Sequence, residues 1–358
     1  MSVLLETQHL TKYYGKNSKY AKGRNSLVKA VDDVSVKIEK GKSVALIGES
    51  GSGKTTLGKL ISCLESSQSG KILFHGKEIE KLRGKALQHV RKDMQIIFQS
   101  SGGVFDPLFT IGENITEVLK NYEKLSAAEY RSRVEEVLVR VGLDASYADR
   151  YSTNLSGGEC QRANIARALV LRPEFVICDE PVSNLDYSIR KNILNLLKKM
   201  QEEYGLTYLL ITHDLSNVPY VCQQVAIMYQ GKIVEFIDST DHLEEKVMHP
   251  YTKLLFQSIP VKHPKERKTE ERLQEAVQTK SFDQGCDFQN RCPCCTERCR
   301  TETPQLRNVK NGHSIMCHNI EKRRISHEKK KRNVNGSHAG SKSDSICFES
   351  GRSSGRGC

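Results

Sequence analysis

The stretch Gly48-Glu-Ser-Gly-Ser-Gly-Lys-Thr55 decides the fold of this chain. It matches the phosphate-binding pattern G-x-x-x-x-G-K-[ST] in full, and it joins an apolar, strand-like run at 44–47 to a helical pattern at 55–64. Glycines let successive backbone N–H groups curl around phosphate oxygens, and the positive N-terminus of the following helix faces the same anion. A chance Gly-rich turn would lack these flanking elements, so the stretch predicts a nucleotide phosphate site.

The side chains of this loop have distinct predicted roles. Lys54 would supply a positive charge to the β- and γ-phosphates, and the Thr55 hydroxyl would bind Mg²⁺. The predicted ATP-binding residues of the loop are Gly48, Glu49, Ser50, Gly51, Ser52, Gly53, Lys54, Thr55 and Thr56.

Two carboxylates follow a second apolar run, at 175–178. Asp179 at the end of that run can hold Mg²⁺ directly or through water. Glu180 would then lie where a water molecule attacks the γ-phosphate, as a general base that typically contributes about 10²–10⁴ in rate. Two acids after a strand are usually a solvated strand end, but beside a phosphate loop they predict a hydrolytic site.

Strand-like runs alternate with helical patterns through the first 260 residues. Further strands are predicted at 34–38, 94–98 and 208–212, and helices at 127–141, 158–169 and 189–204. This alternation predicts an α/β fold with a mainly parallel sheet and helices packed on it. The part from 104 to about 150 has little strand signal and is predicted to be a helical insertion.

The segment Leu155-Ser-Gly-Gly-Glu-Cys-Gln-Arg162 predicts a second anion site. Ser156 can cap the helix that follows, while Gly157 and Gly158 leave N–H groups bare at its N-terminus. One chain does not need two such sites for one nucleotide. Taken alone, the segment would be read as an ordinary capped helix start.

With this segment, the chain resembles the ATP-binding-cassette (ABC) transporter ATPases over about residues 3–260. The segment is close to their LSGGQ motif, with Glu159 and Cys160 at the variable positions. Tyr14 matches the aromatic residue that stacks on adenine, with Tyr13 the second choice. Gln99 matches the Q-loop glutamine, which senses Mg²⁺ and faces the membrane partner. Asp186, in Ser183-Asn-Leu-Asp, matches the D-loop aspartate, and His213 matches the switch histidine.

The resemblance implies a fold and a mechanism. The fold is the P-loop NTPase type of ABC nucleotide-binding domain: a mainly parallel sheet, an antiparallel β subdomain and a helical subdomain at about 100–155. Two cassettes meet head to tail, and each ATP with its Mg²⁺ lies between the phosphate loop of one chain and the LSGGQ-like segment of the other, here Ser156, Gly157, Gly158 and Glu159. Lys54, Gln99, Glu180 and His213 are the expected catalytic residues, and Thr55, Gln99 and Asp179 the expected Mg²⁺ ligands.

Two features resemble the oligopeptide/dipeptide/nickel importer branch: the segment His249-Pro-Tyr-Thr-Lys-Leu-Leu-Phe-Gln-Ser-Ile-Pro260 and a Cys-rich stretch from Cys286 to Cys317. They imply the ATPase subunit of a peptide importer, which works with a second homologous ATPase in a heterodimer, two transmembrane permease subunits and an extracytoplasmic peptide-binding protein. An importer of nickel or another small solute is the alternative, and a soluble ABC ATPase without a transport role is less favoured. The stretch 99–107 departs from the branch's usual DPxxSLNP-like sequence, which leaves partner identity open.

The four spaced cysteines are predicted to bind a metal. Cys286, Cys292, Cys299 and Cys317 are separated by 5, 6 and 17 residues. Thiolates suit either zinc or an iron–sulfur cluster, and the spacing does not decide between them. The resemblance favours a [4Fe-4S] cluster, with Zn²⁺ as the alternative and unligated surface thiols as the third possibility.

Charge and hydropathy limit the remaining function classes. The 358 residues include 55 Lys and Arg and 43 Asp and Glu, a net charge of +12. Six of these excess positive charges lie in the last forty residues, so the body is only mildly basic and no specific nucleic-acid partner is expected. No run of eighteen apolar residues and no signal-peptide pattern is present, so we expect a peripheral protein at the cytoplasmic face of the cell membrane.

Composition also predicts the domain boundaries. A cassette at 1–260 is followed by a linker and Cys-rich region at 261–320. The tail at 321–358 is rich in Lys, Arg, Ser and Gly with little to bury, which predicts disorder. Twelve cysteines are many for a reducing compartment, where they indicate metal or redox chemistry rather than structural disulfides.

Overall fold

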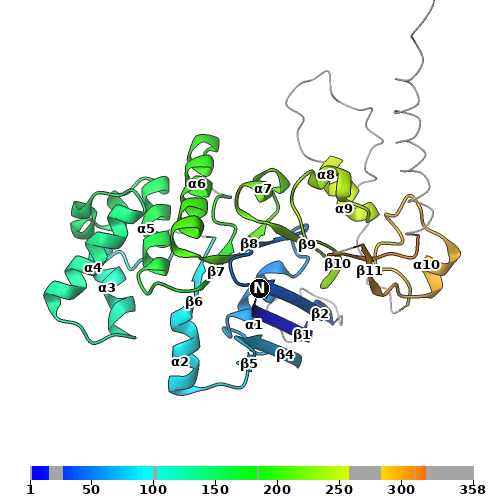
Figure 1. Ribbon diagram of the computed structural model, residues 1–358, viewed down its shortest axis with the longest axis horizontal. Coiled ribbons are helices and arrows are strands. Elements are labelled where there is room, and N and C mark those ends of the chain that lie inside the picture. Colours follow the sequence, from blue (N-terminus) through cyan, green and yellow to red (C-terminus); the bar gives the residue numbers. More distant parts are fainter. Residues whose placement is uncertain are drawn as a thin grey trace, which may run out of the picture. The chain divides into compact units, whose positions relative to one another are not determined.

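The structure is a computed structural model that describes residues 2–15, 27–99, 103–183, 185–257, 284–310 and 312–319 (Figure 1). Contacts group Met1–His318 into one compact unit. The predicted domain boundary at 260, most of the predicted linker, and the tail predicted at 321–358 lie outside the described residues, so these assignments stay predictions. Among the described residues, no helix has both the length and the apolar character that a membrane crossing requires.

An eight-stranded sheet forms the centre of this unit, in the order β11-β12-β10-β9-β3-β8-β7-β6. Its strands are β3 Val44–Ile47, β6 Met94–Ile97, β7 Phe175–Asp179, β8 Thr207–Thr212, β9 Gln224–Tyr229, β10 Lys232–Ile237, β11 Leu306–Lys310 and β12 His313–Met316. From β9 through β6 neighbouring strands are parallel, as the sequence predicts. β3 and β8 are buried along their whole length, which explains why they read as continuous apolar runs.

A second, antiparallel sheet has four strands in the order β2-β1-β4-β5. Its strands are β1 Val3–Tyr14, β2 Val28–Glu39, β4 Ser69–Phe74 and β5 Lys77–Glu78. Alternate residues of β1 and β2 pack into a core shared with helix α1 and with one face of the central sheet. This sheet is the antiparallel β subdomain that the resemblance implies.

Helices pack against the central sheet, and further helices form most of the chain between β6 and β7 (Figure 1). The described α-helices are α1 Lys54–Ile61, α2 Gly84–Asp93, α3 Ile111–Lys120, α4 Ala127–Arg140, α5 Gly157–Leu169, α6 Tyr187–Tyr204, α7 Val218–Val221, α8 Leu243–Lys246, α9 Pro250–Gln257 and α10 Glu297–Thr301. Thr110 and Ser126 start α3 and α4 with capping boxes, each completed by a glutamate three residues later. The helical subdomain is therefore formed by α3, α4 and α5.

The Cys-rich segment adds two strands to the central sheet. β12 pairs antiparallel with β10, and β11 pairs with β12. His313 Nε2 on β12 forms a 2.9 Å hydrogen bond with Glu235 Oε1 of β10, and Glu235 is fully buried and also accepts a hydrogen bond from the Met248 N–H. Burial alone would raise the pKa of Glu235, but these hydrogen bonds outweigh it and hold the pKa below its ordinary value. The sequence analysis did not predict this attachment.

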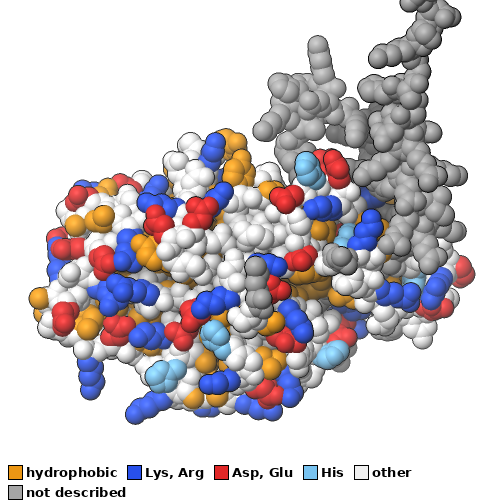
Figure 2. All heavy atoms as spheres, viewed as in Figure 1, with side chains coloured by type: hydrophobic (Ala, Val, Ile, Leu, Met, Phe, Trp, Pro, Cys, Tyr) orange, Lys and Arg blue, Asp and Glu red, His pale blue; other side chains and the backbone are white. Residues whose placement is uncertain are grey.

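Charged side chains of both signs are mixed over the face that Figure 2 displays. Lysine and arginine side chains lie next to aspartate and glutamate side chains across the helical subdomain and the sheets. Examples from the ion pairs are Arg131 with Glu135 and Asp149 on the helical subdomain.

Candidate functional site

The predicted phosphate loop lies between β3 and α1, and close packing requires its glycines. A Cβ atom on Gly53 would lie 1.9 Å from the carbonyl oxygen of Ala30 in β2, and the φ of Gly53 is 106°. A Cβ atom on Gly48 would lie 2.2 Å from the carbonyl oxygen of Met228 in β9. Larger residues at these two positions would push the loop away from the strands that shape it.

The loop leaves the N-terminus of α1 open to an anion. Gly53 occupies the N-cap without a side-chain hydrogen bond, and the first turn carries no acidic residue. The Lys54 side chain is buried and its Nζ donates to the carbonyl oxygens of Gly48 and Glu49, each at 2.8 Å. Burial lowers the pKa of Lys54, while the nearby Glu180 and Asp179 carboxylates act in the opposite direction. A cation and free N–H groups thus meet at one point, as phosphate binding requires.

Thr55 and Asp179 form an oxygen pair beside this loop. Asp179 ends β7, and its Oδ1 accepts a 3.2 Å hydrogen bond from the Thr55 hydroxyl. Burial raises the pKa of Asp179, and the Thr55 hydrogen bond acts against that rise. A hydroxyl and a carboxylate at this distance are ligands that suit Mg²⁺, which prefers oxygen ligands and usually takes only one or two from protein carboxylates.

Glu180 connects two more of the predicted residues. Its Oε2 accepts a 2.7 Å hydrogen bond from Gln99 Nε2, and its Oε1 lies 3.0 Å from His213 Nδ1. Glu180 has a positive φ of 47°, and its N–H donates to the Ile211 carbonyl of β8. The carboxylate is therefore held on both sides, between the residues that follow β6 and β8.

The site is assembled from the carboxyl ends of four parallel strands. The phosphate loop follows β3, Gln99 follows β6, the carboxylates end or follow β7, and His213 follows β8. Open α/β sheets bind their ligands at such an edge. The structure thus brings together six residues that the sequence singled out: Lys54, Thr55, Gln99, Asp179, Glu180 and His213.

The LSGGQ-like segment lies apart from this group. Ser156 caps α5, and its hydroxyl and N–H form a capping box with Glu159. Glu159 also accepts a hydrogen bond from Tyr147, and these bonds lower its pKa to about 2. Within the described ranges, no hydrogen bond or ion pair joins 156–159 to the phosphate loop. The predicted role of this segment, at the nucleotide of a partner chain, stays a prediction.

The D-loop residues border that segment. Asp186 occupies the N-cap of α6 without a side-chain cap bond. A Cβ atom on Gly157 would lie 3.7 Å from the Leu185 side chain, and one on Gly158 would lie 2.9 Å from Ile189 of α6. A side chain on Gly158 would therefore displace Ile189 where α5 packs against α6.

Two tyrosines end β1 near the predicted adenine position. The Tyr13 hydroxyl donates to Asp32 of β2, and burial together with this carboxylate raises the pKa of Tyr13 to about 12. The Tyr14 hydroxyl donates to Glu65, and Lys12 Nζ lies 5.5 Å from the Tyr14 ring centre. Both rings are half-buried, so adenine stacking on Tyr14 stays a prediction.

The sequence analysis missed two residues that touch the loop. The Glu49 N–H donates to the Tyr251 hydroxyl at 2.8 Å, and Arg291 donates two hydrogen bonds to the Glu49 carboxylate at 2.7 and 2.8 Å. These partners are 202 and 242 positions away in the sequence. Tyr251 belongs to the His249–Pro260 stretch that carried the resemblance, but nothing local in the sequence indicated either contact.

The predicted cysteine site does not have the geometry of a metal site. Among the described residues, no group of three or more His, Cys, Asp or Glu side chains is arranged to hold a metal ion. The four cysteines are nevertheless neighbours. The Cys286 N–H donates to the Cys299 carbonyl at 2.7 Å, and burial, followed by the charges of Cys299, Cys317 and Cys292, raises the pKa of Cys286 to about 12.

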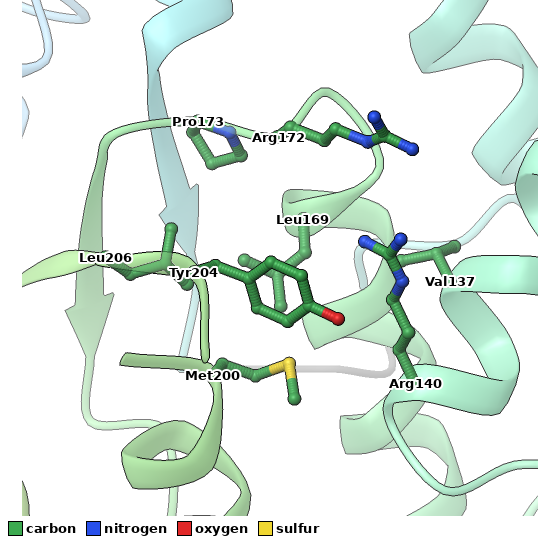
Figure 3. Close-up of a pocket in the computed structure, with 8 residues that line it drawn as sticks. All are labelled: Val137, Arg140, Leu169, Arg172, Pro173, Met200, Tyr204 and Leu206. Carbon is green, nitrogen blue, oxygen red and sulfur yellow. The ribbon is translucent and has the colours of Figure 1, made fainter. Parts of the chain in front are cut away.

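A cavity of about 190 Å³ lies away from this chemistry (Figure 3). Pro173 and Leu206 of its lining precede β7 and β8, so the cavity lies at the edge of the sheet opposite to the phosphate loop. Arg140 stacks over the Tyr204 ring at 4.9 Å. The full lining is Val137, Arg140, Leu169, Arg172, Pro173, Met200, Tyr204 and Leu206.

The fold and the site define an ATPase of the phosphate-loop class. Comparison with known proteins narrows this class. The family description "ABC transporter" matches residues 31–183, and "Oligopeptide/dipeptide transporter, C-terminal region" matches residues 234–299. The chain belongs to the family of ABC transporter ATP-binding proteins, whose members hydrolyse ATP with Mg²⁺.

Individual relatives agree with this assignment. The chain is 40% identical to the oligopeptide transport ATP-binding protein OppF of Haemophilus influenzae, over 88% of this chain and 96% of that protein. It is 38% identical to the oligopeptide transport ATP-binding protein AppF of Bacillus subtilis, over 88% and 97%. Among solved structures, a dimeric ATP-binding cassette with bound ADP and phosphate aligns with a TM-score of 0.57 at 30% identity, over 64% of this chain and 96% of that one.

Proposed function

We propose that this chain is the ATP-hydrolysing subunit of an importer for oligopeptides or dipeptides. The observation that carries the proposal is the match of residues 234–299 to the C-terminal region of oligopeptide and dipeptide transporters. Two relatives that the chain resembles over most of its length are named as oligopeptide transport proteins. The matched region also includes Tyr251 and Arg291, which touch the phosphate loop.

The proposed mechanism assigns a task to each side chain of the site. Lys54 and the N–H groups of the loop bind the β- and γ-phosphates. Thr55, Gln99 and Asp179 are the residues that would hold Mg²⁺, and the ion would neutralise charge on the phosphate oxygens. Glu180 accepts a proton from the attacking water. Gln99 and His213 orient the Glu180 carboxylate, because each already contacts one of its oxygens.

We further propose that the working unit contains a second, homologous ATPase subunit, together with two permease subunits in the membrane and an extracytoplasmic peptide-binding protein. The LSGGQ-like segment would then complete the nucleotide site of the second ATPase. Among the described residues no hydrogen bond or ion pair joins it to this chain's own phosphate loop, and a dimeric cassette shares the fold; both support the proposal. This arrangement places the chain at the cytoplasmic face of the membrane as a peripheral subunit.

The surface after β6 suits a contact with the permease. Phe98, Leu108 and Phe109 are exposed there, and the side chain of Leu108 is 80% exposed. Phe98 directly precedes Gln99, which follows β6 and donates to Glu180, so a protein bound at Phe98 would act close to the Glu180 carboxylate. Exposed apolar side chains are typical of protein contacts where they lie together.

The Glu180→Gln variant tests the hydrolytic role. We expect ATP turnover to fall by about 10²–10⁴ because the general base is lost. Nucleotide binding should persist, and the variant should accumulate as a closed, ATP-bound dimer in size-exclusion chromatography. Glu202→Gln, an exposed change on α6, is the matched control and should keep normal turnover. Unaltered hydrolysis in Glu180→Gln would show that the base is elsewhere.

A reconstituted transporter tests the substrate class. The chain should be assembled with its candidate ATPase partner, permease subunits and binding protein in lipid vesicles. We expect short peptides to stimulate ATP turnover and to accumulate in the vesicles. Stimulation by Ni²⁺ but not by peptides would contradict the peptide assignment and leave the ATPase assignment intact.

We also propose that Cys286, Cys292, Cys299 and Cys317 hold a [4Fe-4S] cluster, with Zn²⁺ as the alternative metal. Support comes from the chemistry of four thiols that lie near one another, three of which, those of Cys292, Cys299 and Cys317, influence the pKa of Cys286. Anaerobic purification followed by iron, sulfide and zinc analysis tests this directly. About four iron per chain is expected for the cluster. Loss of the metal in Cys286→Ser, but not in Cys63→Ser, would identify the ligands, and absence of any metal would overturn the proposal.

A further inference from the structure

The turn between Cys286 and Cys292 contacts the cassette through three side chains. Asp287 pairs with Lys232 of β10 at 2.9 Å. Phe288 is 1% exposed and lies in the main apolar core. Arg291 reaches the phosphate loop at Glu49. A segment of seven residues is therefore attached at three points, one of which is the predicted nucleotide site.

Arg291 and Glu49 form a two-point ion pair. Both guanidinium Nη atoms donate, one to each carboxylate oxygen, at 2.8 and 2.7 Å. Arg291 also lies over the Tyr229 and Phe288 rings, with its guanidinium carbon 6.0 and 5.6 Å from their centres. The pair with Glu49 raises the pKa of Arg291 above its ordinary value. The guanidinium is thus fixed in one orientation, unlike that of a solvated surface arginine.

The same aromatic group holds the backbone of Glu49. Phe288 packs against Tyr251 and Tyr229, with ring centres 5.6 and 5.3 Å apart. The Tyr251 hydroxyl accepts the hydrogen bond from the Glu49 N–H. Both the backbone and the side chain of Glu49 therefore depend on residues packed against the 286–292 turn.

This arrangement matters for an anion site. Glu49 is the second residue of the phosphate loop, and its carbonyl oxygen accepts a hydrogen bond from Lys54. An unpaired carboxylate here would repel nucleotide phosphates and would be free to compete with them for Lys54. Arg291 neutralises this charge and keeps the carboxylate turned to the Cys-rich segment.

We propose that Arg291 is a positioning residue for the phosphate loop: by pairing with Glu49 it holds the loop in its nucleotide-binding conformation and couples the 286–292 turn to nucleotide affinity. This inference rests on the proposed nucleotide site at the loop. Coupling between two sites is reciprocal, so a change in the turn alters nucleotide affinity and bound nucleotide stabilises the turn.

The test measures MgATP binding and hydrolysis with the full chain, using a fluorescent ATP analogue and a phosphate-release assay. For Arg291→Gln we expect the Kd and KM for MgATP to rise about threefold to tenfold, as suits a two-point but half-exposed ion pair. The kcat should change less than twofold, because Arg291 touches no reacting group. The Kd of Arg291→Lys should lie between the Kd of the wild type and that of Arg291→Gln. Arg298→Gln removes an arginine from an exposed pair in the same segment and should leave Kd unchanged.

A double-mutant cycle separates positioning from general weakening of the fold. In a Glu49→Gln background the carboxylate that Arg291 neutralises is absent, so Arg291→Gln should add less than a twofold change in Kd. An equal rise in Kd in both backgrounds, or no rise in either, would overturn the inference. Thermal unfolding of each variant identifies any that does not fold, in which case Arg291→Lys takes its place in the cycle.

Lys54→Ala distinguishes failure of the inference from failure of the proposed site. Normal MgATP binding by Lys54→Ala would contradict the proposed nucleotide site, in which Lys54 binds the phosphates. Loss of binding in Lys54→Ala together with a normal Kd in Arg291→Gln would leave the nucleotide site intact and reject only the role of Arg291.

Discussion

Helices α1 and α5 both begin with glycines and a predicted anion site, yet their N-termini are built differently. Gly53 starts α1 in a left-handed conformation without a side-chain cap, and Lys54 is its first residue. Ser156 starts α5 with a complete capping box, in which Glu159 places a carboxylate in the first turn. Figure 1 shows α1 beside the central sheet and α5 among the helices between β6 and β7.

The difference lies in how each helix satisfies its first N–H groups. A helix leaves four of them without partners inside the helix, and side chains or ligands must satisfy them. In α5 the Ser156 hydroxyl satisfies the Glu159 N–H, and the Glu159 carboxylate, which accepts from the Ser156 N–H, lies at the same end, so an arriving phosphate meets a negative charge there. In α1 the first N–H groups are open to a ligand, and the buried ammonium group of Lys54 lies at the same end. We infer that α1 is the primary nucleotide site and that α5 contributes only once a partner chain presents its nucleotide.

Removal of the α1 cation should have the largest effect. Lys54→Ala should lower kcat/KM for ATP by about 10²–10³, the cost of removing one preorganised donor from a developing charge. The first residue of α5 is Gly157, which has no charged side chain to remove. A phosphate-release assay measures the change, and a loss below about tenfold would contradict the assigned role of Lys54.

Giving α1 the acid of α5 should have the next largest effect. Thr56 occupies the third position of α1, as Glu159 does in α5. Thr56→Glu should weaken MgATP binding about 100-fold, because a carboxylate about 5 Å from a phosphate costs about 3 kcal/mol at an effective dielectric constant of 20. Thr56→Gln is the neutral control. Equal losses in both variants would indicate steric rather than electrostatic disruption.

Neutralising the acid of α5 should have a smaller effect in the opposite direction. Glu159→Gln keeps the capping box, because glutamine also serves at this position. In a Glu180→Gln background we expect ATP-dependent dimerisation to tighten about twofold to fivefold, as charge near a helix terminus is worth about 0.3–1 kcal/mol. Analytical ultracentrifugation of the dimer with the partner ATPase measures this. Weaker dimerisation would mean that the Glu159 carboxylate itself serves the interface.

The pH dependence of α5 should show the smallest effect. Hydrogen bonds from Tyr147 and Ser156 lower the pKa of Glu159 from 4.5 to about 2. A lowered pKa adds stability that is complete above the ordinary value of 4.5 and is lost as pH falls toward 2. Urea unfolding at pH 6, 4.5 and 3.5 should therefore show that the stability advantage of the wild type over Glu159→Gln becomes smaller as the pH falls. An advantage that grows as pH falls would contradict this sign.

Four of the six residues that meet at the carboxyl edge of the central sheet could be predicted from local patterns in the sequence. The phosphate loop has its glycines and lysine in one short run, and Asp179 and Glu180 directly follow an apolar strand. Parallel strands bring their carboxyl ends to one edge, so these runs meet even though the chain between them is long. Gln99 and His213 were identified only through the resemblance, since a lone polar residue after a strand has no chemical signature of its own.

The contacts of the Cys-rich segment could not be predicted in this way. Arg291 pairs with Glu49 across 242 positions, and β12 joins β10 through the buried Glu235–His313 pair. In a sequence with many charged residues, each charged side chain has many potential partners of opposite charge far away in the chain. Only the folded core around Phe288 and Tyr251 selects one of them. The closed metal site predicted from four cysteines was not found among the described residues, although the four thiols lie near one another.

The sequence by itself determined the class of this protein, the positions of β3, β6, β7 and β8, and the side chains that meet at the carboxyl ends of these strands. These properties depend on short runs whose backbone preferences and side-chain types act locally. Tertiary structure alone decided that the Cys-rich segment joins the central sheet through β12 and reaches the phosphate loop through Arg291. Those contacts depend on packing between segments distant in the chain, where burial and neighbouring charge select one partner among many.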